Sequence, residues 1–325
     1  MRIAIPDDYQ DCVRHLKCFS ALADHDVTVF NDTVKDIKTL AARFANAQVL
    51  VLTRERTRIT AELLDQLPDL QMISQTGKLA GHVDLAACTQ RGIAVAEGSG
   101  TGSATAEMTW ALIMASRRNL VSEANRLRGG LWQGSIGQQL QGQCLGIWSY
   151  GRIGQQVAAY GKAFGMRVWV WGRAGSRAKA QADGFELAPS RETFFSDSDV
   201  ISLHVRLNAE TYGIVGQADL ARMKSTALLV NTSRAELIAS DALALALRLG
   251  RPGFAAVDVY EDEPVLGAAH PLLRLPNALC TPHLGYVETD NYERYFGLAF
   301  DHINHFAACR PTGLVNPEVM QQLRR

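Results

Sequence analysis

The amino-acid sequence predicts an α/β protein of two domains, each built on a parallel sheet covered by helices. Short apolar runs of strand length alternate with helical segments along most of the chain, which is typical of parallel sheets. The length of 325 residues and a hydrophobic content of 47% are sufficient for two hydrophobic cores. A glycine-rich segment, residues 98–103, separates the apolar runs into two series and predicts a hinge between the domains.

Each apolar run is short and continuous, as expected for strands that are buried on both faces of a sheet. The first series predicts strands at residues 3–5, 27–30, 49–53, 72–75 and 94–96, and the second series predicts strands at residues 145–148, 168–171, 200–203, 227–231, 255–258 and 278–281. Between the two series, residues 104–117 predict an apolar helix. A last helix at residues 288–309 has one strongly apolar face and is expected to pack back onto the first domain. The predicted domains are residues 1–99 with 287–325, and residues 100–286.

The second series opens with a strand, a glycine turn and the start of a helix. Gly151 and Gly154 carry no side chains, so backbone amides can approach a pyrophosphate at the positive end of the helix dipole. The strict pattern has three glycines, and Ser149 stands in place of the first. The alternative is an ordinary strand–helix crossover that binds no ligand. The segment therefore predicts a bound dinucleotide, with contacts from Tyr150, Gly151, Arg152, Ile153 and Gly154.

The end of the next strand favours NADP over NAD. In NAD-type domains an acidic residue accepts a hydrogen bond from the ribose 2′-hydroxyl at this point, about 20 residues after the glycines. Here Gly172 takes that place, and Arg173, Ser176 and Arg177 follow it. Arginine suits a 2′-phosphate because its planar guanidinium forms charge-assisted hydrogen bonds. The alternative interpretation is that Ser176 caps a helix that ends at Gly184, with both arginines solvated.

Composition excludes several classes of partner. Lys plus Arg equals Asp plus Glu at 33 each, and a net charge of zero favours neither nucleic acid nor an anionic membrane. The N-terminus lacks the apolar core of a signal peptide and no segment approaches membrane-spanning length, which predicts a cytoplasmic protein. The six scattered cysteines are expected to be reduced. Cys12, His15 and Cys18 lie near one another, but no further ligand is spaced to complete a site, so no metal is predicted.

Three charged or titratable side chains follow strands of the second series: Arg234, Glu263 and His283. Ligands bind outside the carboxyl ends of the strands in open α/β sheets, so these residues are expected to lie near the dinucleotide. Together they supply what carbonyl reduction needs, namely a proton donor, an acid to orient it and a cation for the substrate. Taken singly, a histidine at a strand end is more often a hydrogen-bonded structural residue, and Arg234 could simply cap or pair.

These segments closely resemble the D-isomer-specific 2-hydroxyacid dehydrogenase family, over nearly the whole chain. The resemblance is carried by residues 151–154, 231–234, 258–264, 270–273 and 281–283. It implies a Rossmann-like, doubly wound cofactor domain and a flavodoxin-like substrate domain. It also implies hydride transfer between NADP or NAD and a small 2-oxo acid or D-2-hydroxy acid, with phosphoglycerate, glyoxylate and hydroxypyruvate as candidates. A homodimer built on the cofactor domain is implied as well, with the helix at residues 104–117 at the interface.

The resemblance further implies roles for individual residues. Arg234 would bind the substrate carboxylate, His283 would be the general acid and base, and Glu263 would pair with His283 and favour its protonated form. Arg206 replaces the proline that is common in the family and adds a cation near the adenosine, unless it pairs with Glu210 instead. The remaining expected cofactor contacts are His204, Arg206, Thr232, Ser233, Asp258 at the nicotinamide, and Gly285.

Two loops of the first domain are expected to bind the substrate through Arg54, Thr76, Gly77 and Lys78. Backbone amides near Gly77 could bind the second carboxylate oxygen, as the resemblance implies. Arg54 and Lys78 would suit an acidic or phosphorylated substrate tail. The alternative is that these cations are simply solvated, as exposed cations at strand ends usually are.

Two other functions fit the same fold. The first is a phosphite-type oxyanion dehydrogenase; formate oxidation is disfavoured because enzymes resembling formate dehydrogenase pair the histidine with glutamine, whereas this chain has Glu263. The second is a non-enzymatic protein that senses NAD(H), since fold alone does not settle function. The sequence leaves open which 2-hydroxy acid is used and in which direction the reaction runs.

Overall fold

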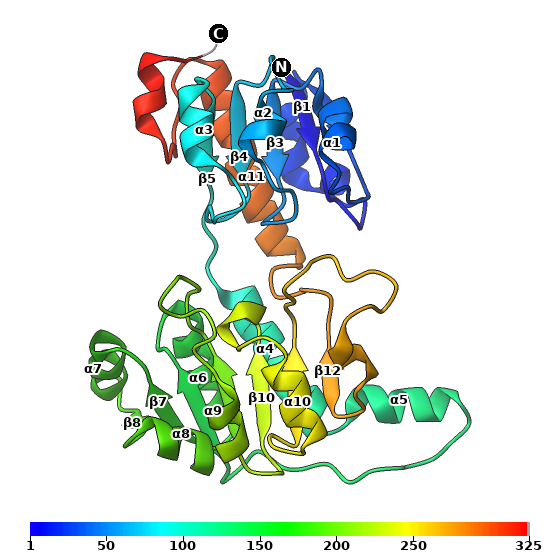
Figure 1. Ribbon diagram of the computed structural model, residues 1–325, viewed down its shortest axis with the longest axis vertical. Helices are drawn as coiled ribbons and strands as arrows, with labels where there is room; N and C mark the ends of the chain where they lie inside the picture. Colours follow the sequence, from blue (N-terminus) through cyan, green and yellow to red (C-terminus); the bar gives the residue numbers. More distant parts are fainter. Residues whose placement is uncertain (324–325) are drawn as a thin grey trace. The chain divides into compact units, whose positions relative to one another are not determined.

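The structure is a computed structural model that describes residues 1–323 (Figure 1). It divides into two compact units, of which the first contains Met1–Thr101 and Glu288–Arg325 and the second contains Gly102–Val287. The boundary at Thr101 falls within the glycine-rich segment from which the hinge was predicted. Each unit is a parallel sheet with helices packed against it, so the predicted fold class is confirmed.

The first unit contains a five-stranded sheet in the order β2-β1-β3-β4-β5. Its strands are β1 (Arg2–Ile5), β2 (Asp26–Val29), β3 (Val49–Leu52), β4 (Met72–Gln75) and β5 (Ala94–Glu97). Its helices are α1 (Ile37–Phe44), α2 (Ala61–Leu64), α3 (Leu85–Gln90) and α11 (Thr289–Ala307), with 3-10 turns at Val13–His15, Lys17–Leu22 and Pro317–Gln321. The last helix returns to this unit as predicted, and the hydroxyl of Ser74 on β4 donates to the carbonyl of Ala299 on α11 at 3.0 Å.

The second unit contains a seven-stranded sheet in the order β12-β11-β10-β9-β6-β7-β8. Its strands are β6 (Cys144–Trp148), β7 (Arg167–Trp171), β8 (Glu186–Leu187), β9 (Val200–Leu203), β10 (Leu228–Asn231), β11 (Phe254–Val257) and β12 (Ala278–Cys280). Its helices are α4 (Ser103–Arg117), α5 (Leu120–Arg128), α6 (Arg152–Ala163), α7 (Ala174–Ala182), α8 (Arg191–Asp197), α9 (Gln217–Arg222) and α10 (Ala242–Arg248), with 3-10 turns at Ala235–Leu237 and Pro271–Arg274.

The strand order reverses between β6 and β9. From β6 the chain builds outward through β7 and β8 on one side, and then returns to place β9 to β12 on the other. This is the topological switch point of a doubly wound sheet, where the loops that follow the strands diverge and leave a crevice. The predicted glycine turn follows β6 and therefore lies at this point.

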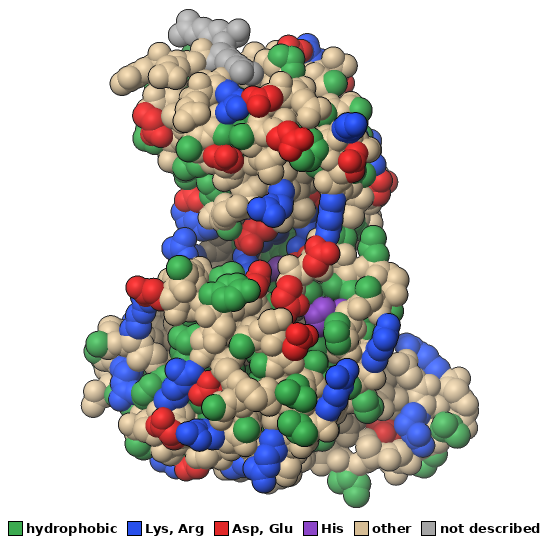
Figure 2. All heavy atoms as spheres, viewed as in Figure 1, with side chains coloured by type: hydrophobic (Ala, Val, Ile, Leu, Met, Phe, Trp, Pro, Cys, Tyr) green, Lys and Arg blue, Asp and Glu red, His purple; other side chains and the backbone are tan. Residues whose placement is uncertain are grey.

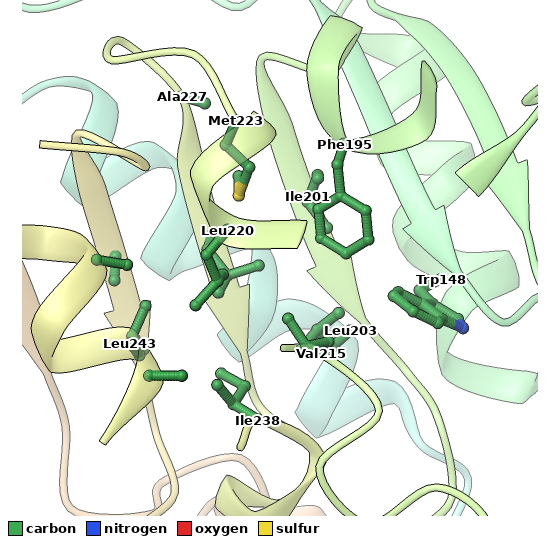
Figure 3. Packing of buried hydrophobic residues seen from close by; sticks show 14 of the residues in the cluster. Trp148, Phe195, Ile201, Leu203, Val215, Leu220, Met223, Ala227, Ile238 and Leu243 are labelled. Carbon is green, nitrogen blue, oxygen red and sulfur yellow. The ribbon is translucent and has the colours of Figure 1, made fainter. Parts of the chain in front are cut away.

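Successive side chains of each central strand point to opposite faces of this sheet and pack into two separate hydrophobic cores. Trp148, Ile201 and Leu203 belong to the core that Figure 3 shows, together with Phe195 from α8 and Leu220 from α9. The intervening residues Leu145, Ile147 and Val200 belong to the opposite core, which α4 and α6 cover. Burial on both faces explains why these strands appear in the sequence as continuous apolar runs.

The predicted strands are all present, whereas two elements were not predicted. β8 has only two residues, too few to carry an alternating pattern. No residue of α5 is buried; its apolar residues Leu120, Ala124 and Leu127 do recur at helical spacing, but the pattern is short and was missed. The alternative interpretation in which Ser176 caps a helix is wrong, because α7 begins at Ala174 with Arg173 as its N-terminal cap.

The surface is consistent with the balanced composition. Figure 2 shows acidic and basic side chains interspersed over the visible face rather than gathered by sign. No helix within residues 1–323 is both long and apolar enough to cross a membrane. All six cysteines are free thiols.

Candidate active site

The two glycines of the turn after β6 serve different purposes. A Cβ atom at Gly154 would overlap the carbonyl oxygen of Ser149, so the first turn of α6 packs on the end of β6 only because residue 154 has no side chain. A Cβ atom at Gly151 would meet no atom within 4 Å. Open space beside Gly151 at the N-terminus of a twelve-residue helix is what a pyrophosphate requires. The turn therefore fits a dinucleotide.

Ser149, which stands in place of the first glycine of the pattern, has a backbone conformation typical of glycine. Ser149 has a φ of +77°, in the left-handed region that favours glycine. Its N–H donates to the carbonyl of Trp171 at 2.8 Å, which ties the turn to the end of β7. The departure from the strict pattern is thus a serine in a glycine conformation, held by a backbone hydrogen bond.

Tyr150 is placed differently from the other residues of the turn. Its side chain is buried in the core beneath the turn, where its hydroxyl donates to Asp183 at 3.0 Å and its ring packs against Phe185. Its backbone N–H donates to the hydroxyl of Ser176 at 2.5 Å. The structure therefore gives Tyr150 and Ser176 a part in anchoring the turn, and the side chain of Tyr150 does not point to the open space beside Gly151.

The predicted cations lie near the end of β7, close to a glycine with a positive φ. Gly172 has a φ of +155°, so a side chain there would be strained, although an added Cβ would make only ordinary contacts, the nearest 3.4 Å from the Cα of Ser149. Arg173 forms an ion pair with Glu210 at 2.6 Å. Arg177 lies over the ring of Trp171, 5.0 Å from its centroid. Glu210 therefore pairs with Arg173 and not with Arg206, which was the alternative for Arg206.

His204 follows β9 at the switch point and carries an unpartnered buried atom. Its Nε2 is 2.9 Å from the hydroxyl of Ser202, and its Nδ1 has no hydrogen-bond partner among residues 1–323. Burial lowers the pKa of the imidazole to about 3, so the ring is neutral at physiological pH. A buried nitrogen without a partner next to the glycine turn is consistent with a ligand that completes this site.

Glu263 and His283 lie together at the carboxyl end of the sheet, as predicted. Their Oε2 and Nδ1 atoms are 2.7 Å apart, and the two side chains are only 14% and 13% exposed. The other oxygen of Glu263 accepts from the backbone N–H of Tyr260 at 2.9 Å. The ring of His283 also contacts Tyr286 edge-on at 5.3 Å between centroids. With Nδ1 bound to the carboxylate, Nε2 is the nitrogen through which His283 can exchange a proton with a substrate.

Asp258 holds the loop that carries His283. Its carboxylate is fully buried and accepts from the hydroxyl of Thr281 at 2.6 Å and from the N–H groups of Leu284 and Gly285, both at 2.7 Å. Burial is the largest influence on this carboxyl and raises its pKa, whereas these hydrogen bonds act in the opposite direction. The hydroxyl of Thr105 on α4 donates to the carbonyl of Gly285 at 2.7 Å and secures the loop from the other side.

Arg234 follows β10 in a turn built by Asn231. The side-chain amide of Asn231 donates to the carbonyl of Arg234 at 2.8 Å, and its oxygen accepts from the N–H of Ser233 at 3.0 Å. The guanidinium donates to the carbonyl of Ser233 at 2.6 Å. Thr232 is buried, and its hydroxyl is 2.7 Å from that of Thr109 on α4. The backbone at Arg234 is thus held at the same edge of the sheet as Glu263 and His283.

The predicted substrate residues of the first unit lie at the carboxyl ends of β3 and β4. The N–H of Arg54 donates to the hydroxyl of Thr76 at 3.2 Å, and a Cβ at Gly77 would overlap the guanidinium of Arg54. The guanidinium of Arg54 also lies 5.6 Å from the ring centroid of Tyr295 on α11. Lys78 forms an ion pair with Glu97, which neutralises the charge expected to serve an acidic substrate tail.

Comparison with known proteins identifies the family. The model of the NAD-binding domain of D-isomer-specific 2-hydroxyacid dehydrogenases matches residues 110–285. The glyoxylate reductase of Aeropyrum pernix is 37% identical over 291 residues, which cover 86% of this chain and 85% of the relative. The chain belongs to the D-isomer-specific 2-hydroxyacid dehydrogenase family. It is an oxidoreductase that transfers a hydride between a nicotinamide cofactor and 2-oxo or 2-hydroxy acids.

Solved structures agree with this membership over almost the full length of the dehydrogenase. An oxidoreductase from Ralstonia solanacearum is 52% identical, with a TM-score of 0.96 and coverage of 98% of both chains. A phosphoglycerate oxidoreductase from Vibrio cholerae is 50% identical, with a TM-score of 0.93, and the match covers 95% of this chain and 99% of that one. The predicted family, fold and enzyme class are confirmed.

Sequence reasoning missed several residues that position the site of this dehydrogenase. Thr105, Thr281 and Ser202 hold loops or rings through single hydroxyls. Threonine and serine are common throughout the chain and carry no spacing signal, so only the folded structure reveals these contacts. Among residues 1–323, no group of three or more His, Cys, Asp or Glu side chains could hold a metal ion.

Proposed function

We propose that this dehydrogenase interconverts a short 2-oxo acid and its D-2-hydroxy acid, with Arg234, Glu263 and His283 as the catalytic residues. Glyoxylate and hydroxypyruvate are the first candidates, and the acids of the phosphoglycerate reaction are the alternative, as the names of its relatives suggest. The single observation that supports the proposal most is the pair of Glu263 and His283, 2.7 Å apart and largely shielded from water.

The chemistry assigned to His283 follows from its hydrogen bonds. During reduction its Nε2 gives a proton to the carbonyl oxygen, and during oxidation the same nitrogen takes a proton from the hydroxyl. The bound nicotinamide supplies or accepts the hydride at the substrate carbon. The carboxylate of Glu263 stabilises the imidazolium and fixes the ring, since its second oxygen is itself held by the N–H of Tyr260.

Arg234 is proposed to orient the substrate. Its planar guanidinium can bind a carboxylate through two parallel hydrogen bonds, which sets both the position and the rotation of the 2-oxo acid. Its backbone is fastened by Asn231, so the reacting carbon is presented to the cofactor and to His283 in one geometry. Arg54, Thr76 and Gly77 are proposed to contact the same substrate from the first unit, while Lys78 is engaged with Glu97.

The proposed cofactor is NADP in preference to NAD. No acidic side chain stands at Gly172, where the positive φ disfavours any side chain. Arg173 and Arg177 lie next to Gly172, at the start of α7, and Arg206 lies in the loop after β9. Arg173, Arg177 and Arg206 are the proposed charged partners of a 2′-phosphate; the hydroxyl of Ser176 accepts from the N–H of Tyr150 and keeps its own proton to donate. Gly151, Arg152, Ile153 and Gly154 are proposed to surround the pyrophosphate.

A homodimer is proposed on the basis of α5 and the segment that follows it. No residue of α5 is buried, and Leu131, Trp132 and Ile136 beyond it are 53%, 74% and 96% exposed. A hollow of about 260 Å³ lies nearby, lined by residues that include Val121, Phe254 and Leu275. Such exposed apolar side chains are typical of subunit interfaces. The exposed apolar surface lies here rather than on α4, whose apolar residues pack within their own unit. A cytoplasmic location also remains a prediction.

The experiment that tests the function is oxidation of NADPH and of NADH, followed in parallel with purified protein. The substrates are glyoxylate, hydroxypyruvate, phosphohydroxypyruvate, pyruvate and a bulky 2-oxo acid, and phosphite with the oxidised cofactors serves as the rival. Oxidation with a short 2-oxo acid is expected. Turnover with phosphite alone would favour the oxyanion dehydrogenase, and cofactor binding without any turnover would favour a sensing protein.

A further inference from the structure

One ion pair of the second unit lies in the region proposed for the adenosine of the cofactor. Arg173 follows β7 and Glu210 lies in the loop after β9, and their side chains meet at 2.6 Å. In the sheet, β6 lies between β7 and β9. The pair therefore reaches over the carboxyl end of β6, the strand that leads into the glycine turn. An acidic group thus stands beside the cation expected to bind the 2′-phosphate.

Glu210 is held in this place by its own loop. Its N–H donates to the side chain of Asn208 at 2.9 Å, and the N–H of Thr211 donates to the same oxygen at 3.1 Å. The hydroxyl of Thr211 donates to the carbonyl of Arg206 at 2.7 Å and closes the turn. These bonds fix the backbone at Glu210 independently of Arg173.

We infer that Glu210 is a specificity-determining residue that limits the preference of this dehydrogenase for NADP over NAD by competing with the 2′-phosphate for Arg173. The inference deepens the proposed function and rests on the proposed position of the adenosine. A 2′-phosphate carries a charge of about −1.5 to −2, so Glu210 both occupies its cationic partner and repels it. A ribose 2′-hydroxyl carries no charge and is little affected.

The size of the effect follows from the exposure of the pair. Arg173 and Glu210 are 74% and 78% exposed, so water and salt screen their interaction strongly. Neutralising Glu210 should therefore tighten the binding of a 2′-phosphorylated cofactor by about two- to fivefold, the upper part of the range of an exposed charge pair. Its effect on the unphosphorylated cofactor should be less than about twofold. The difference should shrink as salt is added.

The test is the binding of four ligands to the full-length protein by calorimetry: NADPH, NADH, adenosine 2′,5′-bisphosphate and AMP. The variant is Glu210→Gln, which retains the shape of the side chain. The matched control is Glu186→Gln, which removes another exposed Arg–Glu pair. Glu186 pairs with Arg167 at 2.6 Å, at the amino-terminal ends of β8 and β7 and so away from the carboxyl ends where the cofactor is proposed to bind. Arg173→Gln, alone and with Glu210→Gln, completes a double-mutant cycle.

The expected result is a gain in affinity of about two- to fivefold for NADPH and for the 2′,5′-bisphosphate in Glu210→Gln, lost in high salt and absent from Glu186→Gln. In the Arg173→Gln background the gain in NADPH affinity should be smaller, because the guanidinium for which Glu210 and the 2′-phosphate compete is no longer present. An unchanged ratio of NADPH to NADH affinity in Glu210→Gln overturns the inference and leaves the proposed function intact. A shifted ratio in a protein that reduces no 2-oxo acid would support the inference and refute the proposed substrate.

Discussion

Glu263 and His283 form a pair in which each partner is fixed by a second contact. The carboxylate binds Nδ1 of the imidazole at 2.7 Å and accepts from the N–H of Tyr260 at 2.9 Å, while the ring packs edge-on against Tyr286. The residues come from two loops that follow adjacent strands, β11 and β12. The parallel sheet thus brings together two side chains that are 20 positions apart in the chain.

Replacing Glu263 by glutamine should separate the stabilisation of the imidazolium, which needs the negative charge, from the positioning of the ring, which needs only the size of the side chain. The amide preserves the size of the side chain but cannot stabilise an imidazolium, so kcat is expected to fall by about 10- to 100-fold. The dissociation constant of NADPH should change little, since Glu263 is not assigned to the cofactor. Steady-state kinetics and calorimetry check the two quantities. An equal loss of cofactor binding would show that the substitution disturbs the fold of the loop instead.

Asp258 is expected to act through the loop that carries His283. Asp258→Asn places an amide group where the carboxylate accepts from the N–H groups of Leu284 and Gly285, and at least one donor loses its partner. We expect the free energy of unfolding to fall by about 1–3 kcal/mol and kcat to fall with it. Urea denaturation measures the first quantity. Thr281→Val removes only one of the three donors and should have a smaller effect on both; an equal effect would contradict this account of the loop.

The two glycines of the turn should respond differently to alanine. Gly154→Ala is expected to destabilise the fold by about 1–3 kcal/mol, because its methyl group would overlap the carbonyl oxygen of Ser149. Gly151→Ala should change the free energy of unfolding by less than about 0.5 kcal/mol, since its methyl group meets no protein atom. The same substitution should weaken NADPH binding at least tenfold, because the methyl group would occupy the space proposed for the pyrophosphate. Similar losses of stability in both variants would contradict this distinction.

His204 should make stability depend on pH below neutrality. Burial lowers the pKa of its imidazole from 6.5 to about 3, so between these values the unfolded chain binds a proton that the folded protein does not. Stability should therefore fall as the pH decreases from 6.5, by up to about 1.4 kcal/mol per pH unit from this group. His204→Asn should flatten that dependence in denaturation curves at pH 7, 6 and 5.

The proposed interface predicts a change of oligomeric state. Trp132→Ser combined with Ile136→Ser removes the two most exposed apolar side chains of the segment after α5. Light scattering coupled to size exclusion should show a dimer for the wild-type protein and a shift toward monomer for the double variant. A matched change at Leu249, an exposed leucine after α10, should leave the dimer intact. A wild-type monomer would contradict the proposed role of this segment.

The sequence predicted the fold well because the central strands are buried on both faces. Such strands must be continuous apolar runs, so their carboxyl ends can be read from the sequence. The polar residues that follow them, including Arg234 and His283, can then be assigned to one edge of the sheet. The turn after β6 was predicted for a related reason, since Gly154 has no tolerable alternative at its contact with Ser149.

What the sequence did not reveal depends on contacts between distant segments. The burial of Tyr150 beneath the turn, the pairing of Lys78 with Glu97 and the pairing of Arg173 with Glu210 join residues 19 to 37 positions apart. No local pattern encodes such pairs, because each partner would also be unremarkable on a solvated surface. The exposed helix α5 was missed for a different reason: Leu120, Ala124 and Leu127 recur at helical spacing, but the pattern is too short to stand out.

The most direct test of the central claim compares the wild-type protein with His283→Ala, using the best 2-oxo acid and NADPH. The account predicts that kcat/KM falls by about 10²- to 10⁴-fold, the contribution of a positioned general acid, while the dissociation constant of NADPH stays within about twofold. Unchanged turnover in His283→Ala would contradict the account, because the proton would then come from another group.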